Sequence, residues 1–185
     1  MPDLRIEGYV IVSADGMLAN ADRVMPLELK FEGDARFFTA ALDRAALIVH
    51  GRHSGEDQPS SPRRRRLVLT RAIDALAPDP SNPKALLWNP GGAPFEAACE
   101  RAGVRSGMVA IIGGPHVFGM FMDRYDTFWL SQAPRLRIPN GEPCFPGVPQ
   151  HSPQEILASH GLRAGEAQVL DPAHDVSVTP WRRPG

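Results

Sequence analysis

The sequence has little of several features that define whole classes of protein. It has two cysteines, Cys99 and Cys144, too few for a disulfide framework or a cysteine metal site. No apolar run approaches the ~20 residues that a membrane helix needs. The first twelve residues place charges inside a strand pattern, which is not typical of a signal peptide. We therefore expect a soluble protein in a reducing, cytoplasmic setting, with no membrane partner.

Net charge and metal-binding motifs are also scarce. The formal net charge is -1, so no overall positive field attracts nucleic acid. The one basic run, residues 63–66, has no interleaved aromatics, and its side chains would alternate between two faces of an extended segment. We expect a clamp for a substrate carboxylate or phosphate there, or simply solvated arginines. The six histidines show no metal-ligand spacing such as HExxH, so no metal is expected.

The residues that are present favour one α/β domain over residues 1–185. Hydrophobic residues make up 43% of the chain. Continuous apolar runs predict strands at 6–12, 46–50, 67–70, 85–88, 108–112 and 127–130. Helical periodicity predicts helices at 34–45, 94–101 and 115–122. Strands of this kind, alternating with helices, favour a mostly parallel central sheet that is covered on both faces.

The C-terminal part of the chain and two proline-rich segments complete this prediction. A weak helix at 154–159 precedes two strands, at 167–170 and 176–181, which would add an antiparallel edge to the sheet. Prolines and glycines cluster at 78–94 and 134–153, where we expect long loops. Phe128 and Trp129 lie within a predicted strand, and we expect both in the core.

The turn Gly113-Gly114-Pro115 joins a predicted strand directly to a predicted helix. In open α/β sheets, ligands bind beyond the carboxyl ends of the strands. Two residues without a Cβ let a ligand approach the backbone, and a helix start favours an anion such as a pyrophosphate. A plain strand-to-helix turn is the alternative, and the segment is not a GxGxxG fingerprint.

Two further strand ends carry residues that suit a phosphorylated ligand. One reads Gly51-Arg52-His53-Ser54 and the other Thr70-Arg71. The planar guanidinium of arginine matches phosphate, and hydroxyl groups add hydrogen bonds. Exposed loops with ordinary surface arginines are the alternative. If the three strand ends converge, they would form one site for a phosphorylated cofactor.

Asp34 precedes Phe37 and Phe38 by three and four residues, which would place all three on one helix face. A carboxylate held against apolar rings is desolvated, so its pKa should rise, and it could then relay a proton near neutral pH. Asp34 also follows Gly33 at the expected helix start, where an N-cap is the alternative role. The two roles are compatible.

These segments together resemble the dihydrofolate reductase superfamily, which includes the reductase domain of the riboflavin-biosynthesis deaminase-reductase. The resemblance covers roughly residues 4–134. The matching segments occur in family order and read GYVIVSADGMLAN, VMP, DARFF, VHGRHSGE, SPRRRRLVLTR, IIGGPHVFGMF and TFWLSQ. The resemblance implies a three-layer α/β/α fold, NADPH as cofactor, and hydride transfer to an unsaturated heterocycle as the small-molecule substrate.

The resemblance also implies roles for individual residues. Asp34 would orient the substrate and assist protonation, with Ser131 as its hydroxyl partner. Phe38 would pack on the substrate ring, and Arg64 would bind a substrate carboxylate. The residues implied for the cofactor are Gly51, Arg52, His53, Ser54, Thr70 and Arg71 at the adenosine and its 2′-phosphate, Gly113, Gly114, His116, Val117 and Phe118 at the pyrophosphate and nicotinamide side, and Ile11 and Leu18 beside the nicotinamide. The Gly113–Gly114 peptide bond would be cis.

Some positions depart from the dihydrofolate reductase pattern. Leu27 follows the methionine–proline pair where those enzymes have tryptophan, and SADGMLA is closer to the riboflavin branch. No H-x-E or P-C-x-x-C motif of a zinc deaminase occurs. Dihydrofolate is the leading substrate, with a ribosylaminopyrimidine phosphate as the alternative. A non-catalytic nucleotide-binding protein of the same fold also stays open, as does the choice between a monomer and a homodimer.

Overall fold

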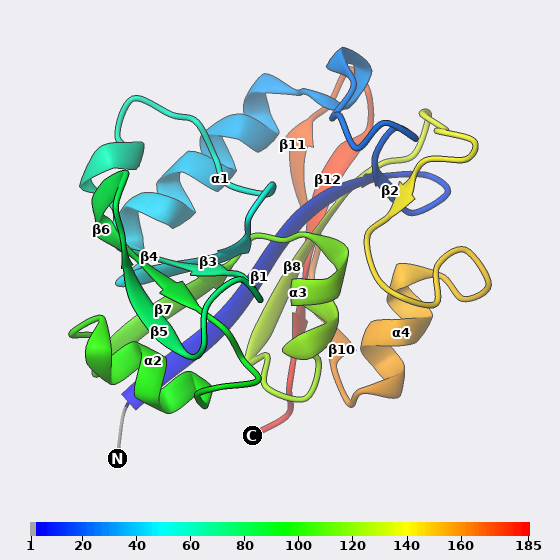
Figure 1. The fold of residues 1–185 in the computed structure, drawn as a ribbon. Helices are drawn as coiled ribbons and strands as arrows, with labels where there is room; N and C mark the ends of the chain where they lie inside the picture. Colours follow the sequence, from blue (N-terminus) through cyan, green and yellow to red (C-terminus); the bar gives the residue numbers. More distant parts are fainter. Residues whose placement is uncertain (1–2) are drawn as a thin grey trace.

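The computed structural model describes residues 3–185, and a ten-stranded sheet crosses its centre. The strand order is β10-β12-β8-β1-β7-β3-β4-β6-β5, with β11 also paired to β12. Six neighbouring strands run parallel: β8 (Thr127–Ala133), β1 (Asp3–Ser13), β7 (Ser106–Ile111), β3 (Leu47–Gly51), β4 (Arg66–Leu69) and β6 (Asn82–Trp88). Because they are parallel, their carboxyl ends meet at one edge of the sheet (Figure 1).

The sheet is antiparallel at both edges. At one edge, β12 (Val176–Arg182) pairs with β8, and β10 (Arg163–Ala164) and β11 (Gln168–Asp171) pair with β12, which confirms the expected C-terminal edge. At the other, β5 (Leu76–Asp79) forms a hairpin with β6. This hairpin corrects the loop expected at 78–94. Pro78 and Pro83 are tolerated because β5 is an edge strand and Pro83 lies at the start of β6.

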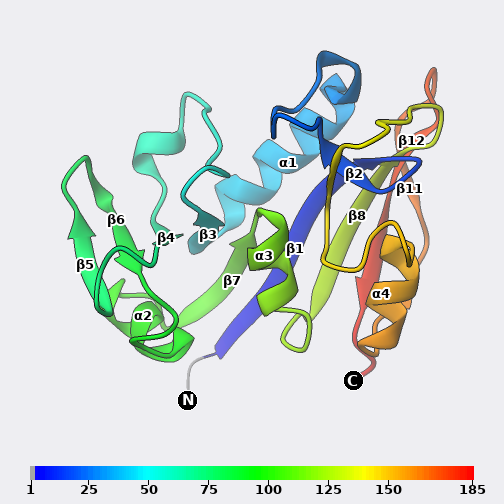
Figure 2. The same cartoon turned by 45° about the vertical axis from the view of Figure 1, so that its right-hand side comes forward.

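Helices cover both faces of the sheet, which gives the predicted three-layer α/β/α architecture. Helix α1 (Glu32–Arg44) lies on one face, and α2 (Phe95–Arg101), α3 (Pro115–Met120) and α4 (Pro153–Ser159) lie on the other (Figures 1 and 2). Two short 3-10 helices, η1 (Leu27–Leu29) and η2 (Ser61–Arg63), lie in loops. On the α1 face, Ala41 and Leu42 pack against Tyr9 and Ile48 of the sheet.

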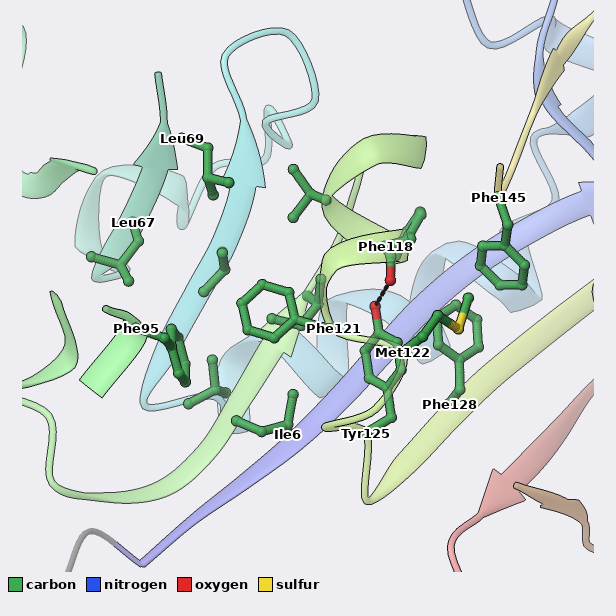
Figure 3. Close-up of a cluster of buried hydrophobic side chains, with 14 of the residues drawn as sticks. Ile6, Leu67, Leu69, Phe95, Phe118, Phe121, Met122, Tyr125, Phe128 and Phe145 are labelled. Carbon is green, nitrogen blue, oxygen red and sulfur yellow. Dashed lines mark hydrogen bonds between the residues drawn. The ribbon is translucent and has the colours of Figure 1, made fainter. Parts of the chain in front are cut away.

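The core on the opposite face is rich in aromatic rings. Phe118 and Phe128 meet edge to face with centroids 5.6 Å apart, and Phe145 packs against both (Figure 3). The hydroxyl of Tyr125 donates a 2.9 Å hydrogen bond to the Phe118 carbonyl. Buried polar groups need such partners, so this bond fixes the turn after α3 against the core.

The proline-rich segment 134–153 packs against the rest of the fold and is not an exposed loop along its whole length. Its residues Glu142–Pro143 form β9, which pairs with β2 (Met17–Ala19) as a separate two-stranded sheet. Cys144 and Phe145 follow and are fully buried. The segment therefore packs beside the loop that follows β1, at the carboxyl edge of the sheet. Within residues 3–185, no helix combines the length and apolar character that crossing a membrane would need.

Candidate functional site

A cleft of about 1810 Å³ lies along the carboxyl edge of the parallel strands, with residues of α1 and α3 in its walls. All but one of the predicted site residues line it. These are Ile11, Leu18, Asp34, Phe38, Gly51, Arg52, His53, Ser54, Thr70, Arg71, Gly113, Gly114, His116, Val117, Phe118 and Ser131. Residues up to 120 positions apart in the chain therefore converge, and the three strand ends singled out in the sequence lie along one cleft.

Two glycine turns form one wall of the cleft. The bond Gly113–Gly114 is cis, as the resemblance implied, and the amide of Gly51 donates a 2.7 Å hydrogen bond to the Gly113 carbonyl. Gly113 has φ +115°, and a Cβ there would lie 3.2 Å from the Phe118 ring. A Cβ on Gly114 would lie 2.9 Å from Ser54 Oγ. Side chains are thus excluded, and the backbone stays open to a ligand.

Cationic side chains surround these turns. Arg52 and Arg71 are exposed and line the cleft, whereas Thr70, which directly precedes Arg71, is buried. The Thr70 hydroxyl accepts a 3.1 Å hydrogen bond from the Ala72 amide, so the chain turns sharply after β4. We call residues 51–54, 70–71 and 113–118 the cofactor half of the cleft.

Asp34 lies across the cleft in the first turn of α1. The N-cap of this helix is Phe31, without a side-chain cap, so the structure excludes the N-cap role considered for Asp34. Burial raises the pKa of Asp34 to about 6, and a hydrogen bond with the Ser131 side chain acts in the opposite direction. A carboxylic acid with such a pKa can hold or release a proton near neutral pH.

Aromatic rings line the same cleft as this acid. Phe37 and Trp129 meet edge to face at 5.5 Å, and Tyr9 stacks on Trp129 at 6.3 Å. Behind them, Glu7 accepts hydrogen bonds from Trp129 Nε1 (2.7 Å) and the Tyr9 hydroxyl (3.2 Å). These rings also pack in the core cluster beneath α1, and they give this part of the cleft a flat apolar floor. We call Asp34, Ser131 and the rings of Tyr9, Phe37, Phe38 and Trp129 the substrate half.

Trp129 packs against the core cluster beneath α1, as expected, and it also lines the cleft. Tyr9, which had no predicted role, belongs to the same cluster and lines the cleft too. A signal was available, because strand side chains alternate with a period of two. Tyr9 precedes Ile11 by two residues on β1, and Trp129 precedes Ser131 by two on β8. Ile11 and Ser131 were predicted site residues, so their same-face neighbours were candidates too.

Arg64 is the one predicted site residue that the cleft does not contain. Its side chain is 7% exposed, and its guanidinium binds Asp43 Oδ1 at 2.7 Å, Glu56 Oε2 at 3.1 Å and Gln58 Oε1 at 2.7 Å. The expectation that Arg64 binds a substrate carboxylate is therefore corrected. Two carboxylates of the chain itself already occupy this guanidinium.

Other walls of the cleft come from segments with no predicted role. Asn89, Pro90 and Gly91 follow β6 and extend the cofactor half. Glu142 and the segment 145–148 bring the proline-rich loop into the cleft. Across residues 3–185, no three His, Cys, Asp or Glu side chains gather as a metal site would require.

Comparisons with known proteins agree with this architecture. No protein-family model and no curated protein sequence matches the chain. Among solved structures, a protein named for riboflavin biosynthesis from Shewanella sp. PV-4 aligns with TM-score 0.67 and 18% identity, over 98% of this chain and 99% of that one. Dihydrofolate reductase from Enterococcus faecalis, complexed with NADP(H), aligns with TM-score 0.66 and 16% identity, over 98% and 97%.

A third similar structure is the bifunctional diaminohydroxyphosphoribosylaminopyrimidine deaminase and 5-amino-6-(5-phosphoribosylamino)uracil reductase from Thermotoga maritima. It aligns with TM-score 0.66 and 12% identity, over 98% of this chain and 57% of that one. At these identities the likeness defines the fold. The chain has the dihydrofolate reductase-like α/β fold, shared by dihydrofolate reductases and riboflavin-biosynthesis reductases.

Proposed function

We propose that this protein is an NADPH-dependent reductase that transfers hydride to a pteridine-type heterocycle, as dihydrofolate reductase does. The observation that carries the proposal is the composition of this cleft. Glycine turns and exposed arginines form one half, and a desolvated acid among aromatic rings forms the other. A dinucleotide in the first half and a planar heterocycle in the second would lie side by side.

The residues of the cofactor half fit NADPH. A Cβ at Gly113 or Gly114 would crowd Phe118 or Ser54, so glycine keeps this turn in a shape along which a pyrophosphate could lie against the backbone. Arg52 and Arg71 would hold the 2′-phosphate, because a guanidinium matches a phosphate and both side chains are exposed. The similar structure from E. faecalis holds NADP(H) and supports this choice of cofactor.

The residues of the substrate half fit the proton-transfer part of a reduction. Reducing a C=N bond adds a hydride to carbon and a proton to nitrogen, and bound NADPH would supply the hydride. Asp34 would hydrogen-bond the nitrogen edge of the heterocycle and hold the proton destined for that ring. The Ser131 hydroxyl would orient the carboxyl group, and Phe38 would pack on the ring. The apolar floor would exclude water from the acid.

Reduction of a ribosylaminopyrimidine phosphate is the second candidate function. One of the three similar structures is named for riboflavin biosynthesis and another includes a 5-amino-6-(5-phosphoribosylamino)uracil reductase, and the turn SADG is closer to the riboflavin branch. A nucleotide-binding protein without turnover is the third. Leu27 motivates it, since this side chain is 79% exposed where dihydrofolate reductases have tryptophan.

One experiment separates these candidates. The purified protein is mixed with NADPH and either dihydrofolate or the ribosylaminopyrimidine phosphate, and loss of NADPH absorbance is followed. Consumption with dihydrofolate supports the main proposal, and consumption with the pyrimidine alone supports the second. Tight NADPH binding, measured by fluorescence titration, without consumption of either substrate supports the third. Absence of NADPH binding contradicts all of them.

A further inference from the structure

A network centred on three buried charged side chains, Glu56, Arg64 and Arg66, adjoins the cofactor half of the cleft. It also includes Asp43, whose side chain is 55% exposed, and the buried imidazole of His50. The side chains of Glu56, Arg64 and Arg66 are 5%, 7% and 7% exposed. Buried charges carry a large desolvation penalty and persist only where they are paired. The proposed chemistry uses none of these residues, so the network needs another explanation.

Glu56 is the centre of the network and joins three parts of the fold. Its two carboxylate oxygens bind the guanidinium groups of Arg64 and Arg66. Arg64 lies just before β4, and Arg66 is the first residue of that strand. Arg64 also reaches Asp43 on α1, at 2.7 Å. The loop after β3 is thus tied both to the sheet and to the helix that carries the proposed acid.

Arg66 extends the network towards the glycine turn through His50. Arg66 Nη1 lies 3.1 Å from His50 Nε2, and His50 Nδ1 lies 2.7 Å from the carbonyl oxygen of Gly51. A guanidinium can only donate, so Nε2 must be the unprotonated acceptor. Nδ1 then carries the proton, and its N–H donates a hydrogen bond to the Gly51 carbonyl. The two contacts select one neutral tautomer of His50.

Gly51 is held on both sides by this arrangement. Its carbonyl accepts a 2.7 Å hydrogen bond from His50 and a longer one, 3.2 Å, from the Ser54 amide that closes the turn, and its own amide donates a 2.7 Å hydrogen bond to the Gly113 carbonyl. The Gly51 carbonyl belongs to the peptide group that leads into Arg52. Fixing that carbonyl fixes the direction in which residues 52–54 leave the strand. Neither Arg66 nor His50 lines the cleft itself.

We propose that His50 and Arg66 are positioning residues, which fix the turn of residues 51–54 in the shape that binds the dinucleotide. This inference rests on the proposed function, because it assumes that the turn binds NADPH. The network acts before the cofactor arrives, so the turn loses little freedom on binding. Preorganisation of this kind raises affinity without adding a contact.

The test compares two replacements of His50 by fluorescence titration with NADPH. His50→Leu removes both hydrogen bonds, and we expect the Kd for NADPH to rise about tenfold, the usual effect of a lost buried hydrogen bond. His50→Asn keeps a side-chain N–H donor near the position of Nδ1, and we expect a Kd within about threefold of the original. KM for NADPH should follow Kd, while kcat stays nearly constant.

Arg65→Met is the matched control for the charge network. Arg65 adjoins Arg64 and Arg66 in sequence, but its exposed guanidinium donates to the Ala102 carbonyl away from the network. We expect an unchanged Kd for this variant. A normal Kd for His50→Leu, with only a lower melting temperature, would show a purely structural role and overturn the inference.

A second variant covers the case in which a single replacement unfolds the chain. The triple variant Glu56→Leu, Arg64→Met, Arg66→Met replaces the buried ions by apolar groups of similar size, which proteins often tolerate well. A folded triple variant with the original NADPH affinity would overturn the inference. In the unaltered protein, 15N NMR should show His50 neutral and protonated at Nδ1, and any other state contradicts the network.

These results also separate the inference from the proposed function. If the unaltered protein does not bind NADPH, the proposed function fails, whatever the variants do. If it binds NADPH and the His50 and triple variants bind equally well, the proposed function stands and the positioning role fails.

Discussion

The cofactor half of the cleft is built from backbone and exposed cations, whereas the substrate half is built from aromatic side chains around one buried acid. Gly113 and Gly114 leave their peptide groups open, and Arg52 and Arg71 reach into solvent. Asp34, in contrast, is desolvated enough that its pKa rises to about 6. The first half suits a highly charged ligand that stays partly hydrated, and the second suits a planar ligand that must lose its water.

This difference predicts that substitutions in the two halves act on different steps. Changes in the cofactor half should weaken NADPH binding and leave the proton-transfer step intact. Changes at the acid should slow turnover and leave NADPH binding intact. Replacements that move both quantities together would show that the cleft does not divide in this way.

The largest effect is expected for Asp34→Asn. Asparagine keeps the size of the side chain but cannot hold the transferable proton, so turnover should fall about 100-fold to 1,000-fold. The Kd for NADPH should stay within about twofold, because Asp34 lies outside the cofactor half. Steady-state kinetics and fluorescence titration measure the two quantities.

Glu100→Gln is the control for this substitution. Glu100 lies on α2 outside the cleft, and its side chain is 70% exposed and pairs with Arg105. Its turnover should equal that of the unaltered protein. Full activity of Asp34→Asn would remove Asp34 from the chemistry and favour the nucleotide-binding protein without turnover.

Gly113→Ala should give the largest effect in the cofactor half. Its φ of +115° strains any residue with a Cβ, and that Cβ would lie 3.2 Å from the Phe118 ring. The free energy of unfolding should fall by about 1 to 3 kcal/mol. Because the strained turn shifts, the Kd for NADPH should rise at least about tenfold.

Gly103→Ala separates backbone strain from cofactor binding. Gly103 also has a positive φ of +77°, but it follows α2 and lies outside the cleft. A Cβ there would lie 3.0 Å from the flexible end of Arg65. Its stability should fall by about 1 kcal/mol with no change in NADPH affinity. If both glycine variants bind NADPH normally, the Gly113–Gly114 turn does not contact the cofactor.

Much of this architecture could be predicted from the sequence because its signals are local. The strands of the parallel core are continuous apolar runs, and the turns at their carboxyl ends follow directly from those runs in sequence. Topology then brings the turns together without further information. The cofactor half depends mainly on such turns, which explains why the sequence could predict that they converge on one cleft.

The rest depends on pairings between distant residues, which spacing does not reveal. Arg64 binds Glu56 and Asp43, which lie 8 and 21 positions away, so no local pattern distinguishes it from a free anion-binding arginine. The hairpin of β5 and β6 was missed because Pro78 and Pro83 resemble loop residues. The two-residue strand β9 is defined only by its pairing with β2.

A smaller effect is expected at Arg52 and Arg71. Replacing either by Gln removes one charge that would face the 2′-phosphate, so the Kd for NADPH should rise about tenfold and the Kd for NADH by less than about twofold. Arg63→Gln, an exposed arginine outside the cleft, should change neither value. An equal rise in Kd for NADPH and NADH would mean that the arginines do not bind the 2′-phosphate.

The smallest effect concerns stability, and it tests the desolvation that distinguishes the substrate half. The pKa of Asp34 is raised from its ordinary value of 3.8 to about 6, so the folded state holds this proton more tightly than the unfolded chain does. The contribution of Asp34 to stability therefore falls as pH rises from about 4 to about 6, and the loss is complete above that window.

Asparagine does not titrate, so Asp34→Asn should be more stable than the unaltered protein at about pH 7.5. With allowance for partial exposure, the gain should be about 1 kcal/mol. At about pH 4 the two should be nearly equal. Urea denaturation at both pH values measures the difference. A variant that is less stable at the higher pH would show that Asp34 is stabilised as a carboxylate, which would contradict its role as the proton-holding acid of this cleft.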